Sequence, residues 1–201
     1  MFNLIKEAKE LINKNPKNME ELWDIRNILT SKLCWFLPSV SNTNTILYAL
    51  KDSNNILDIG CGTGIVGKYI ADKYPDKSYL GIRKSMYDCD YNTYYPEQVK
   101  NIKGNELNIY LGSHKFDTWL LIWPPYKRPL AKEAFKAFLK NNYVKDLLYI
   151  GELEGANGDE EFHNILDEWI YSTPSNLKYI HYDFKSYTGI HDICIKFSKQ
   201  I

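Results

Sequence analysis

The sequence lacks a long apolar run, and this absence argues against a membrane protein. No stretch approaches the roughly 20 consecutive apolar residues that a transmembrane helix needs. The polar amino-terminal segment also lacks the apolar core of a signal peptide. We therefore expect a soluble, cytoplasmic protein with no membrane partner.

Cysteine is also scarce, which bears on metal sites and disulfides. The chain has four cysteines, and none belongs to a Cys-x-x-Cys pair: Cys34, Cys61, Cys89 and Cys194. Neither a zinc site nor a disulfide framework is indicated by such scattered positions. Glu152 and Glu154 have no histidine partner at ligand spacing, so we expect no metal. A reducing compartment is consistent with this composition.

Neither sign of charge is in excess. Among 201 residues, lysine plus arginine and aspartate plus glutamate both number 25, so the net charge is zero. No global basic field draws such a protein to nucleic acid, which is therefore not a favoured partner. Basic residues do recur every four positions at Arg128, Lys132, Lys136 and Lys140. This stripe fits contact with phosphates, but zero net charge favours a solvated helix face.

What the sequence does contain is a glycine-rich motif at residues 56–67, ILDIGCGTGIVG. Its first four residues form the short apolar run that is typical of a buried parallel strand. Gly60, Gly62 and Gly64 follow, and apolar residues then recur at helical spacing. Glycines tolerate positive φ and let a ligand approach the backbone, and the helix points its first N–H groups at the turn. We expect a nucleotide-like ligand there.

The remaining patterns indicate a doubly wound α/β fold. Helices are predicted at residues 4–12, 19–36, about 43–50, 64–73, 130–140 and up to about 171. Strands are predicted at residues 56–59, 78–82, 99–102, 118–123, 146–150, 177–184 and 192–197. The last two are joined by a loop too short for a crossover helix, so they should pair antiparallel. We expect a mostly parallel sheet with an antiparallel carboxy-terminal edge strand.

Residues 1–50 are predicted to be helical and to cover the core, with Thr43 or Thr45 as the cap of the third helix. No internal repeat and no long Gly/Ser linker separates them from the rest. Residues 51–201 are therefore expected to form one compact α/β domain.

In this order the motifs resemble the class I (Rossmann-like) S-adenosylmethionine-dependent methyltransferase family, from about residue 46 to the end. Asp58 and the three glycines are similar to the first motif of that family, an acidic residue followed by Gly-x-Gly-x-Gly. The resemblance implies S-adenosylmethionine as cofactor and S-adenosylhomocysteine as product. It also implies that the backbone of residues 60–64, with Gly60, Cys61, Gly62 and Gly64, lies against the methionine part. Asp58 would orient its amino end.

Two later stretches carry the resemblance further. Gly104-Asn105 is similar to the Gly-Asp that reads the cofactor adenine in this family, and the Asn105 carbonyl can accept the same bond. The stretch LLIWPPY resembles the Asn/Asp-Pro-Pro-Tyr motif of amino-group methyltransferases. It implies an acceptor site formed by Trp123, the Pro124 carbonyl and a stacking wall at Tyr126.

The sequence departs from the family at two of these positions. Arg83 stands where the second strand usually ends in an acidic residue that accepts the ribose hydroxyls, and guanidinium has no acceptor. A surface position or a salt bridge to Asp88 remains an alternative to a ligand contact for Arg83. Trp123 replaces the polar acceptor for the target amine, and an indole N–H can only donate. It would form either a pocket floor or ordinary packing at the strand end.

Acidic residues follow the fifth strand, at the sheet edge where open α/β sheets bind ligands. Glu152, and less directly Glu154, could orient or deprotonate a substrate amine or hydroxyl. The alternative is a solvated loop in which Asp159 caps the next helix. Tyrosines at residues 87–95 could stack on a base, although compositional bias explains them as well.

These patterns favour a methyltransferase that acts on an N or O acceptor of a small molecule or an exposed chain terminus. Three alternatives stay open. The glycine turn could hold no ligand, or Gly62, Gly64 and Gly67 could form a GxGxxG site for a dinucleotide with a 2′-phosphate. The chain could also be a catalytically silent binding or scaffold protein with the same fold.

Overall fold

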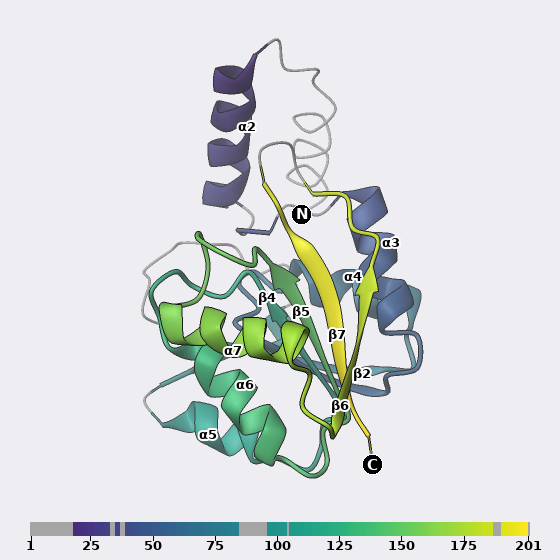
Figure 1. Cartoon of the computed structure of the whole chain (residues 1–201). Helices are drawn as coiled ribbons and strands as arrows, with labels where there is room; N and C mark the ends of the chain where they lie inside the picture. Colours follow the sequence, from purple (N-terminus) through teal and green to yellow (C-terminus); the bar gives the residue numbers. More distant parts are fainter. Residues whose placement is uncertain are drawn as a thin grey trace.

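In the part of the chain that the structure describes, seven strands form one central sheet (Figure 1). The computed structural model describes residues 18–32, 35, 36, 39–84, 96–103, 105–186 and 190–200. The strands are β1 Asn55–Ile59, β2 Ser78–Lys84, β3 Val99–Ile102, β4 Thr118–Ile122, β5 Asp146–Gly151, β6 Leu177–Tyr182 and β7 Ile193–Lys199. The predicted helix at residues 4–12, the tyrosine-rich stretch at 87–95 and Gly104 lie outside the described residues.

The strand order is β3-β2-β1-β4-β5-β7-β6, and the pairs among β1 to β5 are parallel. The C-terminal strand β7 pairs antiparallel with both β5 and β6, which confirms the predicted antiparallel strand. It lies one place in from the edge, because the β6–β7 hairpin folds back and inserts β7 next to β5. This insertion decides which residues meet at the carboxyl edge of the sheet.

Helices cover both faces of the sheet (Figure 1). Their bounds are α2 Met19–Lys32, α3 Val40–Ala49, α4 Ile65–Lys73, α5 Glu106–Leu111, α6 Leu130–Lys140 and α7 Glu160–Tyr171, with a 3₁₀ turn η1 at Pro96–Gln98. One core cluster joins α3 and α4 to the sheet, and the other joins α5, α6 and α7. None of the described helices has the length and apolarity that a bilayer crossing demands.

Strand β4 shows why the sequence builds two cores. All five of its residues are buried, and successive side chains point to opposite faces. Leu120 and Ile122 join the cluster with α3 and α4, whereas Trp119 and Leu121 join the cluster with α5 to α7. Continuous apolar strands are therefore what this sandwiched sheet requires.

Several predicted boundaries are corrected by the structure. Helix α3 begins after Ser39, not at Thr43 or Thr45, because Ser39 and Asn42 form a reciprocal capping box. Helix α2 ends at Lys32, four residues before the expected Phe36, and β6 ends at Tyr182. Helix α5 has no counterpart among the predicted elements, since its six residues are too few to show a helical period.

Whether residues 1–50 form a separate cover stays a prediction. Helix α3 contributes Ile46, Ala49 and Leu50 to the same core cluster as Ile56 of β1. Helix α2 stands beyond the carboxyl edge of the sheet (Figure 1). The described part of this segment thus reaches both the core and the edge where ligands of α/β sheets bind.

Candidate functional site

The glycine turn after β1 adopts the conformation that its three glycines allow. Gly60, Gly62 and Gly64 have φ angles of 81°, 55° and 76°, which other L-residues adopt only at a cost. The N–H groups of Gly60 and Cys61 donate to the Ile82 carbonyl at 2.8 and 3.1 Å. The turn is therefore tied to β2, with its backbone at the carboxyl edge.

Helix α4 starts from this turn without a side-chain cap. Gly64 occupies the N-cap position and makes no side-chain hydrogen bond to the first turn of the helix. The hydroxyl of Thr63 is buried there and has no hydrogen-bond partner in the described part of the chain. Uncapped N–H groups and an unsatisfied hydroxyl together offer polar contacts to a ligand.

Asp58 lies at the base of the turn, and its side chain is only 2% exposed. The Tyr79 hydroxyl donates to Asp58 Oδ2 at 2.7 Å. Burial raises the pKa of Asp58 from 3.8 to about 7, against the opposing effect of the Tyr79 hydrogen bond. A cation that reached this carboxylate would stabilise its charged form.

Gly67 makes this arrangement possible. A Cβ atom at Gly67 would lie 2.2 Å from the Tyr79 ring, so only glycine lets that ring pack against α4. The third glycine of the GxGxxG alternative is thereby explained by packing of helix against strand. The sheet also differs from the dinucleotide-binding order 3-2-1-4-5-6 through its antiparallel β7, so the topology does not favour that alternative.

Cys61 fills the space between the glycine turn and β2. A Cβ atom at Gly81 would meet the Cys61 Sγ at 2.7 Å, so the thiol packs closely against the β2 backbone. Burial and the nearby Asp58 raise the pKa of the thiol well above its ordinary value. Cys61 therefore has the character of a packing residue and not of a nucleophile.

Arg83 reaches from the end of β2 to the glycine turn. Its Nη1 donates to the Gly62 carbonyl at 2.9 Å, and its Nε donates to Asn101 Oδ1 at 2.8 Å. The side chain is thus placed against the first motif, whereas Asp88, its predicted alternative partner, lies outside the described residues. Asn105 precedes α5 and is exposed, and its side chain makes no capping bond.

The predicted acceptor site begins where β4 ends, at Ile122, one residue earlier than predicted. Trp123 has a φ of 49°, an unusual conformation for a bulky residue. Its backbone N–H donates to the Ile150 carbonyl at 2.8 Å. The Pro124 carbonyl accepts a hydrogen bond from the Gly158 N–H at 3.2 Å. Tyr126 is 55% exposed and lies at the surface beside this strand end.

The structure adds a residue here that the sequence patterns did not single out. Asp192 immediately precedes β7, and its Oδ1 accepts a hydrogen bond from Trp123 Nε1 at 2.8 Å. The guanidinium of the buried Arg26, from α2, lies 5.6 Å from the centre of the Trp123 ring. Burial raises the pKa of Asp192 from 3.8 to about 7, Glu152 adds to this rise, and Trp123 and Arg26 oppose it.

Glu152 is held in place by backbone groups. Its Oε2 accepts from the Ala156 N–H at 3.2 Å, and its Oε1 accepts from the His191 N–H at 3.4 Å. The Tyr149 hydroxyl donates to the Glu152 carbonyl at 2.7 Å. Glu154 is exposed, so of the two predicted carboxylates Glu152 is the one fixed near Asp192.

The structure bears on two further alternatives from the sequence. Asp159 caps α7 by accepting from the Phe162 N–H at 2.9 Å, as the solvated-loop alternative expected. In the basic stripe, Lys132 and Lys136 both pair with Glu161 of α7. Part of the stripe is therefore neutralised within the protein, which weakens the case for phosphate contacts.

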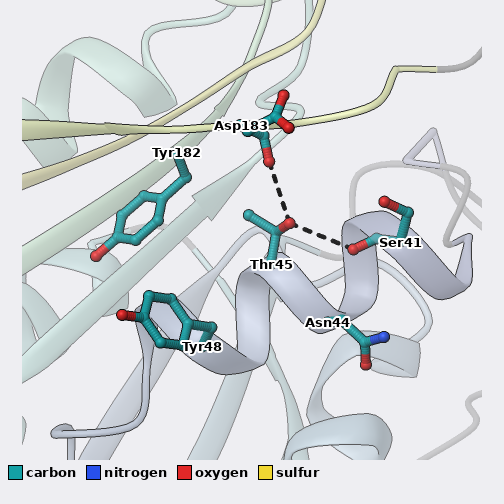
Figure 2. Close-up of a pocket in the computed structure, with 6 residues that line it drawn as sticks. All are labelled: Ser41, Asn44, Thr45, Tyr48, Tyr182 and Asp183. Atoms are coloured by element: carbon teal, nitrogen blue, oxygen red, sulfur yellow. Dashed lines mark hydrogen bonds between the residues drawn. The ribbon is translucent and has the colours of Figure 1, made fainter.

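A shallow groove lies apart from the predicted site residues, between α3 and the end of β6 (Figure 2). Six residues line it: Ser41, Asn44, Thr45, Tyr48, Tyr182 and Asp183. The Thr45 hydroxyl bonds to the carbonyl oxygens of Ser41 and Asp183 at 3.3 and 3.2 Å, which ties α3 to the segment after β6 (Figure 2).

Solved structures of several methyltransferases are similar in fold to this protein. A proposed O-methyltransferase from Klebsiella pneumoniae is similar over 93% of each chain, with 13% identity and a TM-score of 0.59. An rRNA methylase from Streptococcus thermophilus covers 78% of this chain and 93% of its own, with 10% identity and a TM-score of 0.51.

A third similar structure contains the product of a methyl donor. The plantazolicin methyltransferase BpumL, solved with a monoazolic desmethylPZN analogue and S-adenosylhomocysteine, matches 98% of this chain and 99% of its own. The identity is 16% and the TM-score is 0.52. Models of known protein families match no part of the sequence, and neither do curated protein sequences. At identities this low, the likeness establishes the fold.

Proposed function

We propose that this protein is a methyltransferase that uses S-adenosylmethionine and acts on an N or O acceptor. One observation supports the proposal most strongly. The three left-handed glycines lie beside the buried Asp58, in a fold whose solved members include one with bound S-adenosylhomocysteine. A glycine turn that binds no ligand would not explain why a carboxylate is buried beside it, because burial of a charged group is costly.

The residues of the glycine turn fit this cofactor. Oδ2 of Asp58 is held by Tyr79, and no described donor reaches Oδ1, so the carboxylate can accept from the amino end of the methionine part. Gly60, Cys61, Gly62 and Gly64 would present backbone to that part, and Thr63 would supply a hydroxyl. Asn105 would contact the adenine. When bound, the cofactor supplies an activated methyl group.

Arg83 would act by positioning. It cannot accept the ribose hydroxyls, but its bond to the Gly62 carbonyl fixes the turn against which the cofactor would lie. In the acceptor site, Trp123 would form the floor and Tyr126 the entrance. The Pro124 carbonyl would accept a hydrogen bond from the substrate with its second lone pair. Glu152 would orient or deprotonate the acceptor, an effect typically worth about 10²–10⁴-fold in rate.

The acceptor group would belong to a small molecule or an exposed terminus of a chain. The described α/β core carries no large insertion that could clamp a nucleic-acid duplex, and Lys132 and Lys136 are paired with Glu161. Alignment of the acceptor with the methyl group and exclusion of water would provide the rate enhancement.

Calorimetric titration with S-adenosylhomocysteine tests the cofactor assignment. We expect saturable binding to the natural chain and a loss of roughly tenfold or more in Gly62→Val, because valine is strained at positive φ and fills the cradle. Gly112→Ala is the matched control, since Gly112 has an ordinary φ of −87° at the end of α5. Absence of binding by the natural chain contradicts the proposal.

A catalytically silent scaffold remains the second candidate function. By the resemblance, Arg83, which contacts the Gly62 carbonyl, stands at the position of the acidic residue that accepts the ribose hydroxyls in the family. Arg83→Asp separates the two functions. Under the methyltransferase proposal, the natural chain binds S-adenosylhomocysteine with Arg83 in place. Binding that appears only in Arg83→Asp means that the natural chain has lost the cofactor.

A further inference from the structure

The resemblance of the WPPY stretch to the Asn/Asp-Pro-Pro-Tyr motif implies a hydrogen-bond acceptor at position 123, yet the Trp123 indole can only donate. In this structure the indole donates to Asp192. We propose that Asp192 supplies the missing acceptor, that Trp123 positions it, and that the methyl acceptor is an amine. This inference rests on the proposed methyltransferase function.

The topology of the sheet explains the position of Asp192. Insertion of β7 beside β5 pairs Ile150 with Cys194, and the backbone N–H of Trp123 donates a hydrogen bond to the Ile150 carbonyl from the β4 side. Asp192, two residues before Cys194, therefore lies at the carboxyl edge next to the end of β4. A hairpin with β7 at the edge of the sheet would carry this carboxylate away from Trp123.

The hydrogen bonds of Asp192 leave one oxygen for a substrate. Oδ1 accepts a hydrogen bond from the Trp123 indole N–H at 2.8 Å, and the backbone carbonyl of Asp192 accepts from the Ser186 hydroxyl at 3.0 Å. No donor in the described part of the chain bonds to Oδ2. The side chain is half-buried, so a ligand that enters the site can reach it.

The charges around Asp192 favour a cationic acceptor. Within the described ranges, three elements bring charged groups to it: Arg26 comes from α2, Glu152 follows β5, and Asp192 itself precedes β7. The His191 side chain is exposed. When Asp192 is ionised, these described groups amount to two carboxylates against one guanidinium, an excess of negative charge in a half-buried site. Such an excess stabilises an ammonium group and gives a neutral hydroxyl no such advantage.

The same carboxylate can handle the proton that the reaction releases. An ammonium acceptor must lose a proton before its nitrogen has a free lone pair, and Asp192 takes this proton and passes it to solvent. The nitrogen then forms the N–C bond as the C–S bond of the methyl donor breaks, and the electron pair of that bond stays on sulfur. The raised pKa of Asp192, about 7, suits proton transfer near neutral pH.

Sinefungin provides a probe that does not require the unknown substrate. It is an analogue of S-adenosylmethionine in which a carbon bearing an amine replaces the sulfur bearing the methyl group. The ratio of its affinity to that of S-adenosylhomocysteine, measured by calorimetry, isolates the contact made by the amine. We expect the natural chain to prefer sinefungin by roughly tenfold or more at about pH 8, as a charge-assisted hydrogen bond predicts.

Three variants give this preference a residue-level test. Asp192→Asn should abolish the preference while leaving the affinity for S-adenosylhomocysteine unchanged. Trp123→Phe keeps the ring but removes the N–H donor, so it should raise the pH above which the preference is seen. Asp183→Asn, at an exposed carboxylate in the groove of Figure 2, is the matched control and should change neither quantity.

The pH dependence supplies a second readout. In the natural chain the preference should fall as the pH is lowered from about 8 to about 6, because protonated Asp192 no longer attracts the ammonium. An undiminished preference in Asp192→Asn overturns the inference, and so does equal binding of both ligands by the natural chain. If neither ligand binds, the methyltransferase proposal itself has failed.

Discussion

The two halves of the candidate site are assembled in different ways. The cofactor half, which comprises Asp58, the glycine turn, Tyr79 and Arg83, comes from two neighbouring strands that follow each other in the sequence. The acceptor half, which comprises Arg26, Trp123, Glu152 and Asp192, comes from four separate segments. Local sequence therefore determines the first half, whereas the topology of the sheet determines the second.

Both halves nevertheless contain a carboxylate that is wholly or partly buried and accepts a hydrogen bond from one neutral donor. Asp58 is bonded by the Tyr79 hydroxyl at 2.7 Å, and Asp192 by the Trp123 indole at 2.8 Å. Burial raises both pKa values to about 7. They differ in charge environment, because Asp192 faces Arg26 and Glu152.

The largest expected effect is a pH dependence of stability that comes mainly from Asp58. Its pKa is higher in the folded than in the unfolded chain, so the folded state binds more protons between about pH 4 and 7, and stability falls as pH rises through this window. Each pH unit in the window is worth up to about 1.4 kcal/mol. Asp58→Asn should therefore be more stable than the natural chain above about pH 7.

Urea unfolding at several pH values measures this effect. Asp192→Asn should show the same sign with a smaller magnitude, because solvent reaches this half-buried carboxylate and Arg26 stabilises its charge. Asp76→Asn, at an exposed position, is the control and should follow the natural chain. A natural chain that gains stability from about pH 4 to 7 relative to Asp58→Asn contradicts the burial of Asp58.

A smaller effect, limited to the cofactor half, is expected from the variant Gly67→Ala. In Gly67→Ala the new methyl group meets the Tyr79 ring, so the ring must shift and its bond to Asp58 weakens. We expect a loss of about 1–3 kcal/mol in unfolding free energy, together with weaker binding of S-adenosylhomocysteine. The indole N–H resonance of Trp123 should stay unchanged, and its displacement would show that the two halves are coupled. Gly112→Ala is again the control.

The smallest effect belongs to the outer helices, away from both halves. Lys132 and Lys136 lower the pKa of the exposed Glu161 to about 2. Because such surface pairs contribute little and are screened by salt, Glu161→Gln should change the melting temperature only slightly. The change should vanish at high salt, and Glu160→Gln, at the adjacent exposed position, serves as the comparison. A large loss of stability that persists in salt would give this pairing a structural role.

The contrast between the halves also explains which features were predictable from the sequence. The glycine turn, its flanking strand and helix, and the antiparallel β7 follow from local spacing, so they were predicted. Tyr79 could have been found, because it precedes Gly81 by two residues, and Gly81 pairs with Asp58 on the neighbouring strand. Asp192 and Arg26 could not be found in this way, since neither lies near Trp123 in the sequence.

Short-range details were missed for another reason. Ser39 competes with Thr43 and Thr45 as a helix cap, and only the reciprocal bond with Asn42 decides among them. Trp123 extends the apolar run of β4, yet its positive φ ends the strand one residue earlier. Apolar patterns do not contain this information, because strand ends depend on the bonds that neighbouring segments offer.

The central claim is that the carboxyl end of β1 binds a methyl-donor nucleoside. Titration of ¹⁵N-labelled protein with S-adenosylhomocysteine, followed by ¹H–¹⁵N spectra, tests it most directly. The account predicts saturable shifts of the Gly60, Gly62 and Gly64 amide resonances, with residues at the opposite sheet edge, such as Lys145, unaffected. Glycine amides that do not respond to the ligand would contradict it.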